Sequence, residues 1–174
     1  KLTALDGRKG NRLWEVNSVD LEGTRRPLQS FSLVVADLNA DGLMDVASMP
    51  ALGVSVLAGR DGRAQLGILD PGLGYYSQVT AADVTGDGIS ELFFNDRQTQ
   101  AALRTYPQAE LLWSQKSERI SRHYDNPLLL DWDRDGELEF CICRPEGQLV
   151  VRNAVSGEVE AECTFPHLAD NGVV

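Results

Sequence analysis

The chain has 174 residues, 43% of them hydrophobic and 24% charged, which is the balance of a folded protein large enough to bury a core. Its net charge of −10 argues against nucleic acid or an anionic membrane surface as the main partner. No segment approaches the roughly 20 consecutive apolar residues that span a bilayer. The chain begins at Lys1 without a signal-like apolar run, so we expect a mature chain or a part of a longer one.

The first predicted element is a hairpin, LTALDGRKGNRLWEV, at residues 2–16. It reads as strand, tight turn and strand, and Gly10 lies in the turn, where a residue that tolerates positive φ is useful. The same pattern returns at residues 54–69, 103–115 and 149–165. The matching turn positions hold Gly62, Ala109 and Gly157.

An acidic stretch of nine residues alternates with these hairpins. DLNADGLMD at 37–45 is repeated as DVTGDGISE at 83–91 and as DWDRDGELE at 131–139. Apolar or alternating segments of the kind that forms strands lie on both sides of each copy. One unit of about 47 residues therefore contains a strand, an acidic loop and three further strands joined by turns.

Four antiparallel strands in each unit, without helical periodicity, predict an all-β fold and specifically a β-propeller with four-stranded blades. We expect one domain over residues 1–174, with full blades at 27–70, 71–117 and 118–165. Residues 1–26 would be the end of a blade and a connector, and residues 166–174 the start of the next blade. Because propellers close with typically four to eight blades, we expect a section of a larger propeller, with closure across chains as the alternative.

The acidic loops have the oxygen ligands of a calcium site. Positions 1, 3 and 5 offer side-chain oxygens, position 6 is the glycine of a tight turn, position 7 offers a backbone carbonyl and position 9 a carboxylate. Six to eight hard oxygen ligands suit Ca²⁺ rather than zinc or copper. The predicted ligands are Asp37, Asn39, Asp41, Leu43 and Asp45 in the first loop, Asp83, Thr85, Asp87, Ile89 and Glu91 in the second, and Asp131, Asp133, Asp135, Glu137 and Glu139 in the third.

The loop sequence has two other interpretations. An EF-hand needs a glutamate at position 12 and flanking helices, whereas position 12 holds Ser48, Phe94 or Ile142 and the flanks are predicted strands. Asp/Gly-rich turns without metal are the second interpretation, since Asp and Gly favour turns by themselves. Three copies in register, each with an acid at position 9, favour metal, and up to three Ca²⁺ would reduce the net charge from −10 to −4.

The loops together with their strands resemble the FG-GAP or VCBS-type repeat, the calcium-binding blade of integrin α-subunit propellers and of many bacterial surface proteins. The resemblance covers residues 27–165 and implies that each loop joins the first two strands of a blade and binds Ca²⁺ through positions 1, 3, 5, 7 and 9. Thr85 departs from it as a neutral, weaker ligand. The first hairpin also resembles the blade turn of quinoprotein-type (PQQ-like) propellers, A-x-D-G-x-x-G-x-x-L-W.

These patterns predict a calcium-binding propeller module, extracellular, on a cell surface or periplasmic, that serves adhesion, recognition or structural assembly. Its partner would be a protein or glycan ligand, or further blades or chains. A section of a quinoprotein-like propeller enzyme and a scaffolding propeller of an envelope complex are the alternatives. No catalytic residues are expected. His123 in SRHYD (121–125) is close to Ser and Asp in sequence, but a catalytic triad is assembled in space, so this closeness does not indicate an active site.

Five further residues have expected structural roles. Trp14 and Trp113 fall at matching places in the last strand of a unit and should be packing residues. The three cysteines show neither a zinc nor a haem-attachment spacing, and we expect them to be small buried hydrophobes. Cys141 and Cys143 lie on one face of a strand, which is poor geometry for a disulfide, while Cys163 could pair with either.

Overall fold

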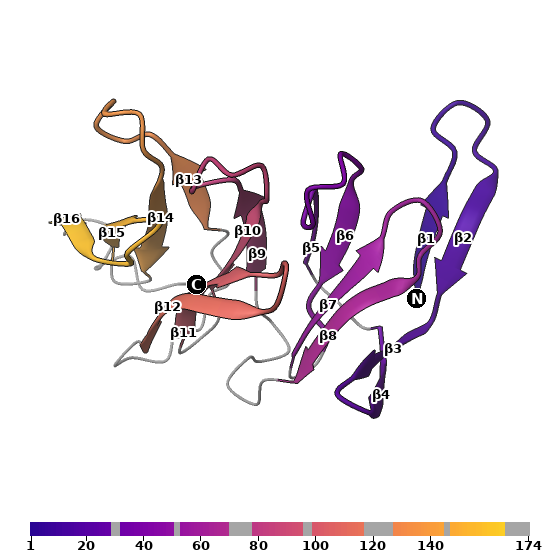
Figure 1. Ribbon diagram of the computed structural model, residues 1–174. Helices are drawn as coiled ribbons and strands as arrows, with labels where there is room; N and C mark the ends of the chain where they lie inside the picture. Colours follow the sequence, from indigo (N-terminus) through magenta and orange to yellow (C-terminus); the bar gives the residue numbers. More distant parts are fainter. Residues whose placement is uncertain are drawn as a thin grey trace.

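The computed structural model describes residues 1–28, 32–50, 53–69, 78–95, 99–116, 127–144 and 147–165. Within these ranges every regular element is a β-strand, as the sequence predicts (Figure 1). None of the described residues belongs to a helix long and apolar enough to span a membrane. His123 and residues 166–174, the expected start of another blade, lie outside the described ranges.

Three sheets of four antiparallel strands follow one another along the chain, and in each sheet the spatial order is the sequence order. The first sheet consists of β5 (Leu33–Ala36), β6 (Asp45–Ser48), β7 (Gly53–Ala58) and β8 (Ala64–Leu69). The second consists of β9 (Gln78–Ala82), β10 (Glu91–Asn95), β11 (Thr99–Arg104) and β12 (Glu110–Lys116). The third consists of β13 (Leu128–Leu130), β14 (Glu139–Arg144), β15 (Gln148–Asn153) and β16 (Val159–Thr164).

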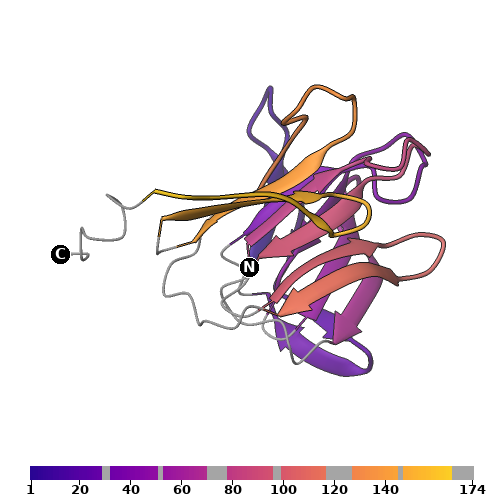
Figure 2. The same cartoon turned by 90° about the vertical axis from the view of Figure 1, so that its left-hand side faces the viewer.

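The sheets are arranged as blades of a β-propeller. The first strands of the three sheets are neighbours, because β9 lies beside both β5 and β13. Figures 1 and 2 show the sheets facing one another, each turned relative to the next. This confirms the predicted fold class.

Two hairpins precede the first sheet. β1 (Leu2–Leu5) pairs with β2 (Arg12–Val16), as the first sequence pattern predicts. The sequence analysis assigned the next residues to a connector, but β3 (Ser18–Leu21) and β4 (Thr24–Pro27) form a second hairpin there. Its turn has two residues with positive φ, Glu22 and Gly23. Val19 and Leu21 of β3 are buried against Leu57, so this hairpin packs on the first sheet.

The apolar core lies between the sheets, and β10 contributes to both sides of it. Successive residues of a strand point to opposite faces of the sheet. Leu92 and Phe94 accordingly pack with residues of the first sheet, including Met49 and Val56, whereas Phe93 packs with Phe140 of the third sheet. This explains why the three central residues of β10, Leu92 to Phe94, are all apolar rather than alternating with polar ones.

Two blade junctions are held by the same tryptophan contact. Trp113 of β12 donates its Nε1 hydrogen to the carbonyl of Ala154 at 2.8 Å, and its ring lies on Gly157 in the turn after β15. Trp14 of β2 likewise donates to the carbonyl of Gly59 at 2.7 Å and lies on Gly62 in the turn after β7. Both glycines have positive φ, and a Cβ on either would lie 2.6–2.8 Å from the indole. The turn glycines are therefore needed for the ring contact as well as for the turn.

The junction between the first and second sheets differs. By register, Leu66 of β8 holds the place that Trp14 and Trp113 hold in β2 and β12. In place of a tryptophan bond, the Thr105 hydroxyl donates a hydrogen bond across this junction to the carbonyl of Leu38, at 2.8 Å. A cavity of about 370 Å³ remains, lined by Leu38, Asn39, Val56, Gln65, Leu66, Thr105, Tyr106, Pro107 and Gln108.

Replacing Trp113 by alanine should lower the free energy of unfolding by about 3–5 kcal/mol, because a buried aromatic ring that packs on Phe93 and Phe140 is replaced by a cavity. Trp113→Phe should cost less, since only the hydrogen bond to Ala154 and part of the ring are lost. Denaturant unfolding measures both. Leu111→Ala, at a 58% exposed position of the same strand, is the control and should change stability little. Equal losses at the two positions would contradict the packing role.

Leu66→Trp should raise the melting temperature, because the indole can enter the cavity at the one described junction that lacks it. Filling a cavity typically adds about 0.5–2 kcal/mol. Leu111→Trp places the same side chain at an exposed position and should not raise it. A lower melting temperature for Leu66→Trp would show that Thr105 and its turn already occupy the space that the ring needs.

Candidate metal centre

The three acidic loops lie at the same end of the sheets, and each joins the first two strands of its sheet (Figure 1). In all three, positions 4 and 6 have positive φ. Position 4 is Ala40, Gly86 or Arg134, and position 6 is Gly42, Gly88 or Gly136. The glycine at position 6 was noted in the sequence, but the left-handed residue at position 4 was not, because Ala and Arg give no sign of it.

In the first and third loops, side-chain oxygens at positions 1, 3 and 5 accept hydrogen bonds from the loop backbone. In the first loop, Asp37 accepts the N–H of Gly42 at 2.9 Å, Asn39 accepts that of Asp41 at 2.9 Å, and Asp41 accepts that of Leu43 at 2.8 Å. In the third loop, positions 1, 3 and 5 make the corresponding bonds. Position 7, which is Leu43, Ile89 or Glu137, is held through its N–H by the position 5 carboxylate. The loops thus fold around their own acidic side chains.

The carboxylate at position 9 begins the second strand of each sheet and is almost completely buried. Asp45, Glu91 and Glu139 are 1%, 0% and 1% exposed. Each accepts the backbone N–H of position 2 across the loop, which is that of Leu38, Val84 or Trp132. The bond closes the loop onto the edge of the sheet.

Burial raises the pKa of both Asp45 and Glu139 above the ordinary carboxylate value. The hydrogen bonds that these carboxylates accept act in the opposite direction, and the neighbouring acids of each loop raise the pKa further. An ionised carboxylate at either place is therefore costly unless a cation offsets it.

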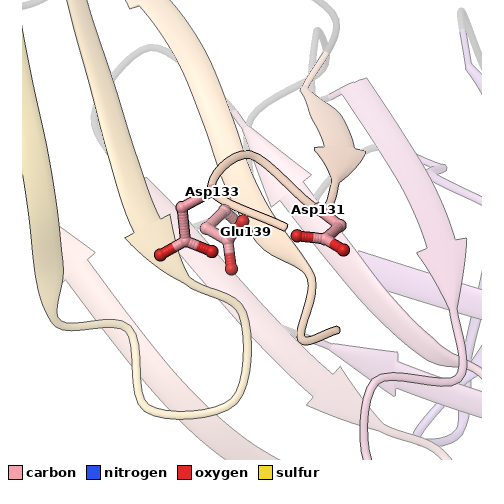
Figure 3. Close-up of side chains that lie close together, drawn as sticks. All are labelled: Asp131, Asp133 and Glu139. Atoms are coloured by element: carbon pink, nitrogen blue, oxygen red, sulfur yellow. The ribbon is translucent and has the colours of Figure 1, made fainter. Parts of the chain in front are cut away.

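The third loop brings its oxygens closest together. One carboxylate oxygen each of Asp131, Asp133 and Glu139 lies within 4.8 Å of the others (Figure 3). Asp135 bonds to the N–H of Glu137, and the Glu137 carboxylate accepts a bond from the Asn153 amide at 3.1 Å. Oxygen donors alone, including one buried carboxylate, fit the donor set of Ca²⁺.

The first loop has a different neighbour at its buried carboxylate. The side-chain amide of Gln65 on β8 donates to Asp45 at 2.8 Å. The amide of Asn39 also approaches the Gln65 oxygen, at 3.4 Å. Gln65 is a site residue that the sequence analysis missed, because only the register of β7 and β8 brings it to the loop.

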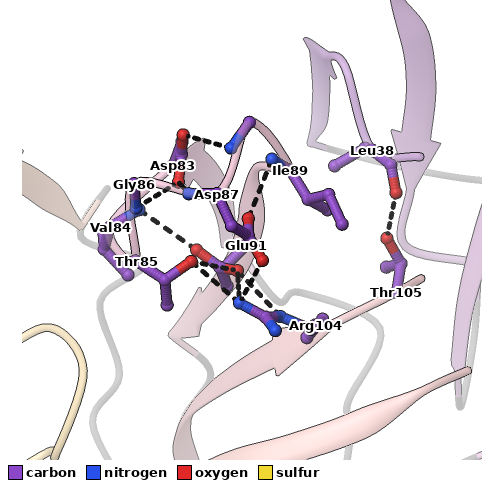
Figure 4. Close-up of polar contacts among 11 residues, drawn as sticks. Leu38, Asp83, Val84, Thr85, Gly86, Asp87, Ile89, Glu91, Arg104 and Thr105 are labelled. Atoms are coloured by element: carbon purple, nitrogen blue, oxygen red, sulfur yellow. Dashed lines mark hydrogen bonds and ion pairs between the residues drawn. The ribbon is translucent and has the colours of Figure 1, made fainter. Parts of the chain in front are cut away.

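In the second loop, three of the five predicted ligands contact an arginine side chain. Arg104 of β11 contacts Thr85, Asp87 and Glu91, as Figure 4 shows. The hydrogen bond that Arg104 donates to Glu91, together with the nearby carboxylate charges, raises the pKa of Arg104 further above its ordinary range. Asp83 holds the backbone of Gly86 and Gly88. The sequence analysis did not place Arg104 in this loop.

The cysteines do not all follow the expectation of burial. Cys141 is buried, and burial raises the pKa of its thiol to about 11, so it behaves as a small apolar residue. Cys143 and Cys163 are exposed instead, because they lie at the far ends of β14 and β16. All three are free thiols, so the disulfide left open in the sequence is not present.

No protein-family model and no curated protein matches this chain. Among solved structures, the biofilm matrix protein Bap1 of V. cholerae is similar with a TM-score of 0.56 and 19% identity, over 95% of this chain and 33% of that chain. BamB from Moraxella catarrhalis gives a TM-score of 0.48 and 13% identity, over 89% of this chain and 40% of that chain. The chain therefore spans a third to two fifths of these proteins. The likeness to Bap1 concerns the β-rich, propeller-like fold, and the resemblance to FG-GAP or VCBS repeats stays a prediction.

Without metal, the free energy of unfolding should depend on pH between the ordinary carboxylate pKa and the raised pKa values of Asp45 and Glu139. The folded chain holds protons there that the unfolded chain releases, so the free energy of unfolding falls as pH rises through this window. In EDTA, the melting temperature should be higher at a pH within this window than at pH 7.5. Asp45→Asn and Glu139→Gln should reduce the difference, whereas Glu158→Gln, which removes an exposed charge, should leave most of it. A wild-type melting temperature that rises with pH in EDTA would contradict the assignment.

Proposed function

We propose that this chain is a calcium-binding propeller module in which Ca²⁺ holds the loop between the first two strands of a blade. The observation that carries the proposal is the convergence of Asp131, Asp133 and Glu139 in the third loop. The first loop has the same order of oxygen donors, with Asp37, Asn39 and Asp41 turned inward by the same backbone bonds.

Calcium would act here as a structural ion. Its positive charge would offset the burial of the position 9 carboxylate, which is the costly group of the first and third loops. In the third loop the residues that would hold it come both from the loop and from the start of β14, so the ion would tie one to the other. Binding free energy then adds to the free energy of unfolding.

We further propose an extracellular, cell-surface or periplasmic location and a role in adhesion, recognition or assembly. One general property of calcium sites and one structural similarity support this. Extracellular calcium modules often bind at about 10⁻⁴–10⁻³ M, a concentration that Ca²⁺ reaches outside the cytosol. The similar structure Bap1 is a biofilm matrix protein, and a matrix or surface role would use the same β-rich module. The partner would be a protein or a glycan that contacts the propeller surface.

Removal of calcium should lower the melting temperature of the wild-type protein. Calorimetry at pH 7.5 in millimolar Ca²⁺ and in EDTA measures the change, which should exceed that caused by the same concentration of Mg²⁺, since Mg²⁺ demands a stricter geometry. Asp133→Asn should reduce the calcium-dependent increase. An unchanged melting temperature in millimolar Ca²⁺ would contradict the proposal.

A second measurement locates the ion in the third loop. Trp132 occupies position 2 of that loop and is 50% exposed, next to Asp131 and Asp133. It should transfer excitation energy to Tb³⁺ bound in place of Ca²⁺, and Ca²⁺ should compete this luminescence away. Trp132→Phe should remove most of the sensitised emission while it leaves calcium stabilisation intact. Emission that persists without Trp132 would place the ion near another tryptophan.

A further inference from the structure

The second acidic loop contains a positive charge that the chain itself supplies. Arg104 Nη2 lies 2.8 Å from Thr85 Oγ1, 2.9 Å from Asp87 Oδ2 and 3.0 Å from Glu91 Oε1. Its Nε donates to the same Glu91 oxygen at 3.1 Å. These oxygens belong to positions 3, 5 and 9 of the loop, three of the five positions predicted to hold Ca²⁺ (Figure 4).

The register of the sheets explains why only this described loop has such a charge. Position 9 lies opposite a residue at the end of the third strand of its sheet. Asp45 lies opposite Ala58 and Glu139 opposite Asn153. Leu92 pairs with Leu103, so Arg104 holds the corresponding place beside Glu91. Alanine carries no donor on its side chain, and the Asn153 amide is neutral and bonds to Glu137.

We infer that the guanidinium of Arg104 is the resident cation of the second loop, so that this blade is closed without metal and the described loops take two Ca²⁺ rather than three. A calcium ion needs oxygens at about 2.3–2.6 Å on all sides. The Arg104 nitrogen occupies the space among the oxygens of Thr85, Asp87 and Glu91, and its charge repels a second cation. Charge-assisted hydrogen bonds to carboxylates are among the strong ones, and arginine stays charged at any working pH.

Thr85 is better suited to bridging Arg104 and Glu91 than to binding a metal ion. Positions 3 of the other loops are Asn39 and Asp133, whose carbonyl or carboxylate oxygens are good ligands for a hard cation. The Thr85 hydroxyl both accepts from Arg104 at 2.8 Å and lies 3.5 Å from Glu91 as a donor. A hydroxyl can bridge the guanidinium and the carboxylate in this way, which a second carboxylate cannot.

The expected total of two bound ions rests on the proposed function. The change in that total when an arginine is removed from one loop or added to another tests the role of Arg104 independently. Arg104→Ala should add one bound Ca²⁺ per chain, because it frees the oxygens of the second loop. Ala58→Arg should remove one, because it places a guanidinium opposite Asp45 in the first loop. Equilibrium dialysis against millimolar Ca²⁺ counts the ions for the wild-type protein and for both variants.

The thermal response gives the second readout. In EDTA, Arg104→Ala should melt below the wild type, and Ca²⁺ should raise its melting temperature more than that of the wild type. Arg104→Lys, which keeps a charge, should bind no additional ion. Ala58→Arg keeps the inference testable if Arg104→Ala does not fold.

The possible failures are distinguishable. A wild-type chain that binds no Ca²⁺ overturns the proposed function, yet a gain of one ion in Arg104→Ala would still support the role of Arg104. A wild-type chain that binds two ions, with no gain in Arg104→Ala and no loss in Ala58→Arg, overturns the inference and leaves the proposed function standing. Three ions bound to the wild type also overturn it.

Discussion

A buried carboxylate at the start of the second strand is the constraint around which each blade is built. Asp45, Glu91 and Glu139 are nearly inaccessible to water, and each closes its loop by accepting a backbone N–H. The hydrogen bond aligns the loop, but it does not neutralise the charge. A buried anion without a counter-charge is expensive. Whatever lies opposite this carboxylate therefore decides how stable the loop is and on what its stability depends.

The three described blades provide different surroundings for the same anion. Gln65 reaches Asp45 with a neutral amide, Arg104 reaches Glu91 with a full charge, and Glu139 lies among further carboxylates. Different residues on the third and fourth strands thus change the electrostatics at this carboxylate, while positions 4 and 6 keep positive φ in all three loops. In the proposed account, the first and third blades depend on calcium and the middle blade does not.

Much of the fold follows from sequence because the repeat is regular. Strand alternation, turn glycines and the unit of about 47 residues predict all-β blades with one acidic loop each, and the three four-stranded sheets agree with this. The hairpin of β3 and β4 was not predicted, because Arg25 and Arg26 are typical of solvated loops and because Val19 and Leu21 are buried through contacts with residues outside the hairpin, including Leu57 of the first sheet. Local sequence does not reveal such a contact.

The candidate site was predictable along the loop but not across the sheet. The oxygen donors at positions 1, 3, 5 and 9 lie within one short segment, so their spacing indicates their grouping. Arg104 is separated from Glu91 by a strand and a turn, and its role depends on the register of β10 and β11. The departure of Thr85 from the ligand pattern was the signal that could have prompted a search for a replacement cation.

The two-sided burial of β10 has a consequence for the way in which the molecule opens. Phe93 belongs to the core shared with the third sheet, and Leu92 and Phe94 to the core shared with the first. In a repeat architecture each unit is stabilised mainly by its immediate neighbours. The amide hydrogens of β10 exchange only when its bonds to β9 and β11 break, and packing on both faces opposes that step. Their exchange should therefore be among the slowest in the described blades.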